Sequence, residues 1–394
     1  MRVLQINSVC GIGSTGRIAT DLHKVLKSNG HESYIAYGRG KSQYCENTIK
    51  IGSKINNYLH VAKTRTFDRH GFGSKNSTRQ FIEVIKNLNP DVIHLHNIHG
   101  YYINIKILFE FLKEFDKKVV WTLHDCWPFT GHCSYFDYIN CEKWKTECHK
   151  CPQKKGYPTS LIFDQSQKNY LEKRNLFTGI RNLTIITPSK WLAKKVKQSF
   201  LSEYPIKIIN NGIDLEKFKP IKCEFRKKQK IEDKFIILGV ANIWGTRKGF
   251  QYFLELSQFL SSDEIIILVG LTSKQINELP PNIIGIEKTN NVQELAEIYS
   301  TSDVFVNPTL EDNFPTTNLE ALATGTPVIT FNTGGSVESI DKNCGFAVEK
   351  GNLKELYKAV KKIKRLNNTR LHCIARSKLY DKNDRYNEYL NIYH

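Results

Sequence analysis

Short apolar runs alternate with longer amphipathic stretches along the whole of this chain. The first run, residues 3–6, leads into a glycine-containing loop, and a helical pattern follows to about residue 28. Apolar runs of this kind predict buried strands, and apolar positions three or four residues apart predict helices. Strands that alternate with helices imply parallel sheets joined by right-handed crossovers. The predicted strands lie at residues 3–6, 33–37, 91–96, 118–124, 184–189, 235–240, 303–306 and 328–330.

The length of the chain, 394 residues, predicts two domains. A single hydrophobic core stops growing at roughly 250–300 residues, so a longer chain divides. The predicted linker is residues 206–214, where a short strand breaks at Asn211 and Gly212. A new α/β series begins at Phe235.

Composition is that of a folded protein without a membrane span. Hydrophobic residues make up 40% of the chain, yet no apolar run approaches the roughly 18 residues that a membrane helix needs. The first six residues begin a strand and lack the apolar block of a signal peptide. We therefore expect a cytoplasmic protein, whose ten cysteines are reduced or metal-bound rather than paired in disulfides.

Positive charge is concentrated in the first half of the chain. Residues 1–205 carry 31 Lys and Arg against 16 Asp and Glu, whereas the remainder carries 26 against 23. A basic domain joined to a nearly neutral one suggests that the first meets a polyanion or an anionic membrane surface. A lysine-rich surface with no such partner is the alternative.

An acidic loop and a short helix follow the strand at residues 303–306. Thr316, Thr317 and Asn318 stand at the predicted start of the helix, where N–H groups and the helix dipole favour an anion such as phosphate. Carboxylates in the loop are suited to sugar or ribose hydroxyls, because ionised acceptors make strong hydrogen bonds. Loops at the carboxyl ends of parallel strands are the usual ligand-binding positions of such sheets.

The residues of this segment resemble the donor-site signature of the family 4 retaining glycosyltransferases. The first acidic position of that signature is Asp312 or, alternatively, Glu311, the second is Glu320, and Gly-Thr-Pro-Val follows at residues 325–328. The resemblance implies the GT-B fold, an α/β architecture of two Rossmann-like doubly wound domains facing across a cleft. It also implies an acceptor-binding domain at residues 1–205, a nucleotide-sugar-binding domain at 206–377 and a C-terminal tail, 378–394, that packs back on the first domain.

Two further loops fit this resemblance. Gly16 and Arg17 end the first glycine loop, where the family faces the donor phosphates and the acceptor; a tight turn needed only for helix packing is the alternative. Arg247 and Lys248 lie in the loop after the strand at residues 235–240, where the family binds the diphosphate. Fixed cations there would stabilise the negative charge that develops on a departing nucleoside diphosphate.

Histidines end two neighbouring predicted strands. His124 stands where the family places a histidine beside the transferred sugar, and we expect Asp125 to orient its imidazole. His96 and His99 end the preceding strand and are predicted to lie on the acceptor side of the same site, together with Asp125. A single histidine is more often a structural group, but this clustering favours a site.

Four cysteines fall within nineteen residues: Cys133, Cys141, Cys148 and Cys151. The close pair at 148 and 151 is typical of a zinc knuckle, whereas the first pair is spaced too widely for the usual pattern. A structural zinc ion and free thiols are therefore both open. A catalytic cysteine is not expected, because glycosyl transfer needs no thiolate.

The sequence thus predicts a retaining, metal-independent hexosyltransferase that needs no cofactor for catalysis. The members it most resembles act on bacterial surface polysaccharides such as O-antigen or capsule, which implies a nucleotide-sugar donor and a glycan acceptor carried on a lipid diphosphate. The basic first domain would bind the inner face of the cell membrane peripherally. A GT-B-fold epimerase and a transferase with a soluble acceptor are alternatives. A basic zinc-containing nucleic-acid-binding protein is the alternative from another class, but it leaves the acidic loop unexplained, so no nucleic acid partner is expected.

Overall fold

The structure is a computed structural model that describes residues 1–366 and 369–394. It divides the chain into two compact units, one of Met1–Asn210 with Arg385–His394 and the other of Asn211–Asp384. The sequence places the domain boundary at 205/206, and the division in the structure falls after Asn210. No helix of the described residues is both long enough and apolar enough to cross a membrane.

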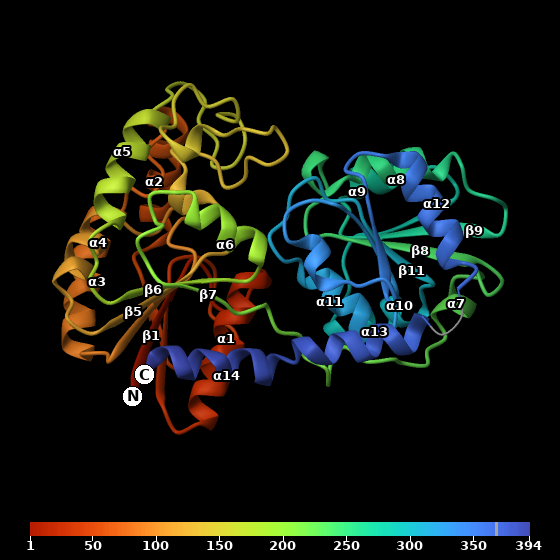
Figure 1. The fold of residues 1–394 in the computed structure, drawn as a ribbon, viewed down its shortest axis with the longest axis horizontal. Coiled ribbons are helices and arrows are strands. Elements are labelled where there is room, and N and C mark those ends of the chain that lie inside the picture. Colours follow the sequence, from red (N-terminus) through yellow and green to blue (C-terminus); the bar gives the residue numbers. More distant parts are fainter. Residues whose placement is uncertain (367–368) are drawn as a thin grey trace. The chain divides into compact units, whose positions relative to one another are not determined.

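The first unit is built on a seven-stranded parallel sheet in the order β3-β2-β1-β4-β5-β6-β7. Figure 1 shows the fold, with β1, β5, β6 and β7 of this sheet labelled. Its strands are β1 (Arg2–Asn7), β2 (Glu32–Tyr37), β3 (Thr48–Lys50), β4 (Val92–Leu95), β5 (Lys118–Thr122), β6 (Leu183–Thr187) and β7 (Ile206–Ile208). Its helices are α1 (Gly13–Ser28), α2 (Lys54–Phe67), α3 (Lys75–Leu88), α4 (Ile105–Glu114), α5 (Ser166–Phe177) and α6 (Lys190–Lys197), with short 3-10 turns η1 (Trp127–Phe129) and η2 (Lys143–Lys145).

The second unit is built on a six-stranded parallel sheet in the order β10-β9-β8-β11-β12-β13. Its strands are β8 (Phe235–Val240), β9 (Glu264–Val269), β10 (Ile283–Ile286), β11 (Val304–Asn307), β12 (Val328–Phe331) and β13 (Gly345–Val348). Its helices are α7 (Phe225–Lys228), α8 (Phe250–Ser257), α9 (Ser273–Asn277), α10 (Val292–Thr301), α11 (Thr316–Ala323), α12 (Leu353–Ile363) and α13 (Thr369–Ser377), with 3-10 turns η3 (Thr246–Lys248), η4 (Ser336–Ser339) and η5 (Lys378–Tyr380).

Both faces of each sheet are buried, as parallel sheets require. In β1, Leu4 and Ile6 belong to the core beneath α3 and α4, whereas Val3 belongs to the core beneath α1. In β8, Ile236 and Leu238 face the core that includes α10 and α11, and Ile237 faces α8 and α12. Near-continuous apolar strands follow from this two-sided burial, and they are the runs visible in the sequence.

The C-terminal helix α14 (Lys382–Tyr393) begins in the second unit and contributes its last turns to the first. Tyr386, Tyr389 and Tyr393 pack in the same core as α1 and β1. The Tyr389 hydroxyl lies 3.1 Å from Thr122 Oγ1 on β5. Tyrosines suit this position because the ring fills apolar space while the hydroxyl reaches a buried polar partner.

Candidate active site

In the second unit, two loops lie side by side at the reversal point, where the order in which the chain adds strands to the parallel sheet changes direction. β8 and β11 are neighbours, but the chain continues from them toward opposite edges of the sheet. The crevice outside the carboxyl ends of such strands is where open α/β sheets bind ligands. The loop after β8 carries Arg247 and Lys248, and the loop after β11 carries Glu311 and Asp312.

These two loops are packed directly against each other. Gly249 has a φ of 76°, and a Cβ atom on it would lie 2.1 Å from the carbonyl oxygen of Pro308. The Leu310 N–H donates to the carbonyl oxygen of Arg247 at 2.9 Å. A glycine is needed at 249 because of both the positive φ and this close approach. The contact fixes the neighbouring Lys248 against the acidic loop.

Lys248 and Asp312 form an ion pair, with Lys248 Nζ 2.5 Å from Asp312 Oδ2. Arg247 Nη1 donates to the carbonyl oxygen of Glu311 at 3.2 Å. Burial raises the pKa of Asp312, but the positive charges of Lys248 and Arg247 outweigh it and leave the pKa below its usual value. Asp312 is therefore an ionised carboxylate at neutral pH, held beside two cations.

A third loop, which the sequence reasoning missed, closes over Asp312 after β12. Gly334 has a φ of 55°, and a Cβ there would lie 1.8 Å from the carbonyl oxygen of Asp312. The Gly335 N–H donates to the same oxygen at 3.1 Å. Two adjacent glycines directly after a buried strand were the signal that could have found this loop.

Helix α11 presents its N-terminus at the same edge of the sheet. Thr316 and Thr317 are half-buried in its first turn. The Asn318 side chain is instead engaged within the unit, accepting from Asn307 Nδ2 at 2.8 Å and donating to Ser339 Oγ at 3.0 Å. Asn318 thus anchors the start of the helix, and the N–H groups of the first turn are the groups suited to an anion.

Glu320 lies one turn further along α11 and is 3% exposed. The hydroxyl of Tyr299, on α10, donates to Glu320 Oε2 at 3.1 Å. Tyr299 is itself fully buried, so its hydroxyl holds the Glu320 carboxylate from the core side of α11. Sequence reasoning missed this support, because Tyr299 lies on the apolar face of its helix and no motif distinguishes it.

In the first unit, His96 and His124 follow β4 and β5, which are adjacent strands. His96 Nδ1 lies 3.1 Å from His124 Nε2, and His96 Nε2 lies 3.0 Å from Gln5 Oε1. Burial lowers the pKa of His124 to about 4 and that of His96 well below its usual value. Both imidazoles are therefore neutral at physiological pH.

His99 and Asp125 form a second pair at this edge. His99 Nε2 lies 2.9 Å from Asp125 Oδ2, and the hydroxyl of Tyr157 lies 3.1 Å from His99 Nδ1. The expectation that Asp125 orients His124 was wrong: its two oxygens accept from His99 and from the N–H of Trp127. The reason is the turn of η1, which directs the Asp125 side chain back toward the loop after β4.

His94 lies on the same strand as His96 but serves the core. Its Nδ1 lies 2.7 Å from the Tyr393 hydroxyl and its Nε2 lies 2.8 Å from Thr122 Oγ1. It is fully buried, and burial lowers its pKa to about 3. This histidine joins α14 to the sheet.

The glycine loop after β1 forms a compact turn at the start of α1. The Gly11 N–H donates to the carbonyl oxygen of Gly16 at 3.1 Å, and a Cβ on Gly16 would lie 3.1 Å from the Gly11 nitrogen. Arg17 is exposed in the first turns of α1. Close packing therefore explains why residue 16 is a glycine. The exposed Arg17 side chain has no such packing role.

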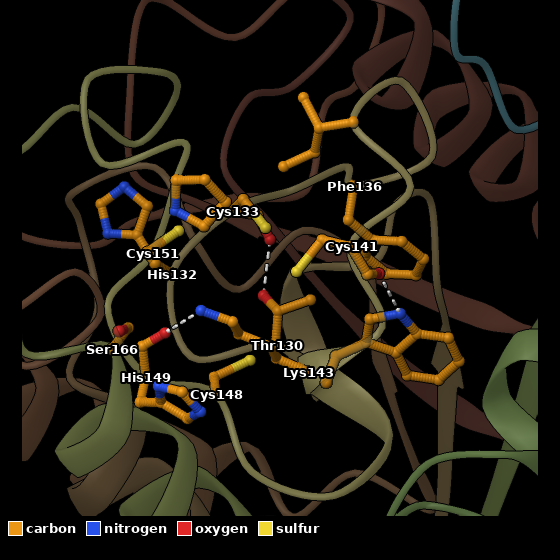
Figure 2. Close-up of a pocket in the computed structure, with 13 residues that line it drawn as sticks. Thr130, His132, Cys133, Phe136, Cys141, Lys143, Cys148, His149, Cys151 and Ser166 are labelled. Carbon is orange, nitrogen blue, oxygen red and sulfur yellow. Dashed lines mark hydrogen bonds between the residues drawn. The ribbon is translucent and has the colours of Figure 1, made fainter.

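The four clustered cysteines line one small pocket of about 20 Å³ in the segment between β5 and α5 (Figure 2). The thiols of Cys133 and Cys151 hydrogen-bond to each other, which lowers the pKa of Cys151 to about 7 against the opposing effect of burial. For the Cys148 thiol, burial has the largest effect and raises the pKa to about 12.

The zinc prediction finds no support in this arrangement. Within residues 1–366 and 369–394, no group of three or more His, Cys, Asp or Glu side chains is placed to hold a metal ion. Aromatic packing holds the segment instead, with Phe136 and Trp144 stacked at 4.7 Å and Phe129 5.3 Å from Trp144. Lys173 Nζ adds buried hydrogen bonds to the carbonyl oxygens of Trp127 and Thr130.

Family comparisons agree with this geometry. The profile of Glycosyltransferase Family 4 matches residues 15–217, and that of the group 1 glycosyl transferases matches residues 234–365. The chain belongs to glycosyltransferase family 4. The group 1 match covers Lys248, Asp312 and Glu320 of this glycosyltransferase.

Relatives of this glycosyltransferase include proteins named for surface-polysaccharide synthesis. It is 28% identical over 374 residues to a putative colanic acid biosynthesis glycosyl transferase, WcaC, of Escherichia coli K12, covering 90% of this chain and 89% of that protein. It is 29% identical to the E. coli UDP-Gal:alpha-D-GlcNAc-diphosphoundecaprenol alpha-1,3-galactosyltransferase, over 43% of this chain and 47% of that one.

Solved structures show the same fold. The sucrose-phosphate synthase of Thermosynechococcus elongatus superposes with a TM-score of 0.74 at 16% identity, covering 100% of this chain and 98% of that one. The two parallel Rossmann-like sheets are thus those of the GT-B fold, as the sequence predicted.

Proposed function

We propose that this glycosyltransferase transfers a hexose, with retention, from a nucleotide-diphosphate sugar to a bacterial surface glycan carried on a lipid diphosphate. The observation that carries the proposal is the Lys248–Asp312 ion pair at the reversal point of the second sheet. It holds a cation and an ionised carboxylate side by side, which are the groups needed for a diphosphate and for sugar hydroxyls.

In this proposal, residues 206–377 bind the donor. Lys248, Arg247 and the first turn of α11, at Thr316 and Thr317, hold the diphosphate. As the glycosidic bond breaks, negative charge grows on the diphosphate, and fixed cations and N–H dipoles stabilise that charge more than the ground state. Glu320 holds the ribose hydroxyls.

Asp312 binds hydroxyls of the transferred sugar, with Glu311 as the alternative. Asp312 is the better supported of the two, because its carboxylate is the one that contacts Lys248. No step requires a metal ion, since the cations of the loop after β8 take the role that a divalent ion plays in other transferases.

Residues 1–205 bind the acceptor in this proposal. His124, with His96, His99 and Asp125, lies on the acceptor side, while Gly16 and Arg17 lie beside the donor phosphates. His96 Nε2 donates to Gln5 Oε1, so His96 Nδ1 accepts from His124 Nε2, and the Nδ1 of a neutral His124 is an acceptor suited to a hydroxyl of the acceptor sugar. Its low pKa keeps it in that form across the physiological range.

The lipid-linked acceptor is inferred from the relatives and from charge. The galactosyltransferase relative acts on a sugar attached to diphosphoundecaprenol, as its name states. The excess of Lys and Arg in residues 1–205 is suited to an anionic membrane surface. We therefore place the protein in the cytoplasm, peripherally on the inner face of the membrane.

The test combines binding and turnover. Thermal shift of the full chain against UDP- and GDP-hexoses identifies the donor, because a ligand at about a hundred times its Kd stabilises by about 2.7 kcal/mol. Transfer to a synthetic lipid-diphosphate sugar is then measured for wild type, Lys248→Ala and Glu320→Gln. Lys342→Ala, which changes an exposed lysine of the same unit, is the matched control.

We expect Lys248→Ala to reduce transfer by roughly 100-fold or more and to weaken the donor-induced shift, because a fixed charge on the leaving group is lost. The control variant should retain wild-type turnover. Normal transfer by Lys248→Ala would refute the proposed donor site.

A further inference from the structure

Helix α2 exposes apolar side chains and buries polar ones, the opposite of an ordinary surface helix. Its exposed positions include the apolar Ile55, Tyr58 and Leu59, each between 65% and 73% exposed, and its buried positions are the polar His60 and Thr64. A surface helix normally turns its apolar stripe toward the core. Here the apolar side chains, at i, i+3 and i+4, form a stripe that faces solvent.

The buried face of α2 is polar because it holds a glycine turn. His60 Nε2 accepts from the N–H groups of Gly71 and Gly73 at 3.1 and 3.2 Å, and His60 Nδ1 lies 3.0 Å from Ser74 Oγ. Burial lowers the pKa of His60 to about 3, so the ring stays neutral and able to accept. Hydrogen bonds therefore dock the helix, and its apolar residues are left for another surface.

A second apolar segment continues this stripe. Leu161, Ile162 and Phe163 are 64%, 60% and 46% exposed. The Leu161 N–H donates to the carbonyl oxygen of Arg65 at 2.7 Å, at the end of α2. We call the exposed apolar side chains of α2 and of residues 161–163 the apolar face.

An aromatic contact joins the two segments of the apolar face. Phe67, the last residue of α2, stacks on Phe163 with ring centroids 5.8 Å apart. Of the eighteen large apolar side chains exposed in the described residues, eight lie between 55 and 67 or between 157 and 163. The others are scattered, as is usual for a soluble surface, whereas a cluster of this kind marks an interaction site.

Positive charge borders the apolar face. Lys54 and Arg65 are exposed on α2, Lys155 is exposed in the neighbouring loop, and Lys154 Nζ donates to the carbonyl oxygen of Ile162 at 3.0 Å. The nearby carboxylate of Asp164 is engaged by the Cys151 N–H at 2.7 Å and by Ser166. An apolar helix face bordered by Lys and Arg is the pattern of a surface that lies in the headgroup region of an anionic bilayer.

The same loop connects the apolar face to the acceptor-side residues. Tyr157, four residues before Leu161, places its hydroxyl 3.1 Å from His99, which in turn pairs with Asp125. A sugar on a lipid diphosphate is presented close to the bilayer surface. A membrane held against the apolar face would therefore lie a short stretch of chain from the residues proposed to receive that sugar.

We propose that the apolar face, formed by α2 and residues 161–163, is the surface by which this protein docks on an anionic phospholipid leaflet. This inference rests on the proposed function for its choice of a lipid-linked acceptor. It specifies which part of the basic first unit enters the membrane interface. Lys54, Arg65 and Lys155 contact lipid phosphates, and the aliphatic and aromatic side chains enter the acyl boundary.

The test is co-sedimentation of the full chain with vesicles. One set contains phosphatidylethanolamine with phosphatidylglycerol, and the other contains phosphatidylcholine alone. The variants are Tyr58→Gln with Leu59→Gln, and Leu161→Gln with Ile162→Gln; glutamine keeps helix propensity similar. Leu371→Gln with Leu379→Gln, at exposed positions of the second unit, is the matched control.

We expect wild type and control to bind the anionic vesicles and to bind phosphatidylcholine weakly. Each face variant should lower partitioning into anionic vesicles by about tenfold or more, because two apolar side chains no longer leave water. The donor-induced thermal shift of the face variants should match wild type, which shows that the fold and donor site are intact.

Three results would overturn the inference. These are wild type that does not sediment with anionic vesicles, face variants that bind like wild type, and a dimer that dissociates in the face variants while their vesicle binding persists. The last result would identify the face as a contact between copies of the chain. Vesicle binding requires no turnover, so a failed transfer assay with intact, face-dependent binding would reject the proposed function alone.

Discussion

Lys248 Nζ lies 2.5 Å from Asp312 Oδ2, and this contact ties the loop after β8 to the loop after β11. The carboxylate is buried, yet its pKa stays below the usual value because Lys248 and Arg247 stand beside it. Removing one partner of a buried pair leaves the other charge uncompensated. The proposed donor site should therefore be sensitive to a single change at either residue of the pair.

Asp312 and Glu311 should differ strongly when their charges are removed. Asp312→Asn removes the negative charge that pairs with Lys248, and we expect transfer to fall by roughly 100-fold. Glu311→Gln should cost less than about tenfold, because Arg247 contacts the main-chain oxygen of this residue, which the substitution keeps. Steady-state transfer rates of both variants decide the question, and the reverse order would assign the sugar contact to Glu311.

Stability of the first unit should fall as pH drops below about 6.5. Burial lowers the pKa of His60 and His94 to about 3 and that of His124 to about 4. Between the unfolded value of about 6.5 and these folded values, the unfolded chain binds protons that the folded chain does not. In that range, each of these imidazoles lowers the free energy of unfolding by about 1.4 kcal/mol for every unit by which the pH falls.

His94→Gln should make the free energy of unfolding fall less steeply with decreasing pH, by the contribution of about one bound proton. Urea unfolding followed by tryptophan fluorescence measures it, since four of the five tryptophans lie in the first unit. Gln80→Ala, at an exposed position of the same unit, is the control and should keep the wild-type slope because it removes no titratable group. An unchanged slope in His94→Gln would mean that His94 is already protonated in the folded state.

Tyr157→Phe should affect the acceptor and not the donor. The substitution removes the hydroxyl that contacts His99 and keeps the ring. We expect KM for the acceptor to rise by about threefold to tenfold, as for the loss of one hydrogen bond, with KM for the nucleotide sugar unchanged. A change confined to the donor KM would contradict the acceptor-side placement of His99.

Alkylation should distinguish the clustered cysteines. Iodoacetamide near pH 7 should label Cys151 well before Cys148, because their pKa values are about 7 and about 12 and the thiolate is the reactive form. Peptide mapping over time gives the two rates. Protection of all four cysteines that a chelator relieves would instead indicate a metal ion.

The order of strands and helices could be predicted from the sequence because both faces of each sheet are buried. β1, β8 and β11 are built mainly of apolar residues, and each is followed by a glycine or acidic loop and then a helix. Family membership followed from the residues of one such segment, from Asp312 to Val328. Lys248 was named in advance from the Lys-Gly pair that the resembling family shows in this loop, and the structure places it beside Asp312.

Pairings between distant residues could not be found in this way. Asp125 lies next to His124 in sequence but pairs with His99, because η1 turns its side chain toward the loop after β4. The closeness of four cysteines in sequence suggested zinc, yet aromatic packing around Trp144 holds that segment in the structure.

The sequence by itself determined the alternation of strands and helices, the family and most of the residues with suitable chemistry, since hydrophobic periodicity and short motifs are local properties. The tertiary structure alone decided which of those residues meet. It set the contact of Lys248 with Asp312 and the packing of the Gly334 loop on Asp312. It also set the hydrogen bonds of Tyr299 with Glu320 and of Tyr157 with His99, and the exposure of the apolar stripe on α2. Those relations depend on sheet order and on packing between segments that lie far apart in the chain, and no local pattern encodes them.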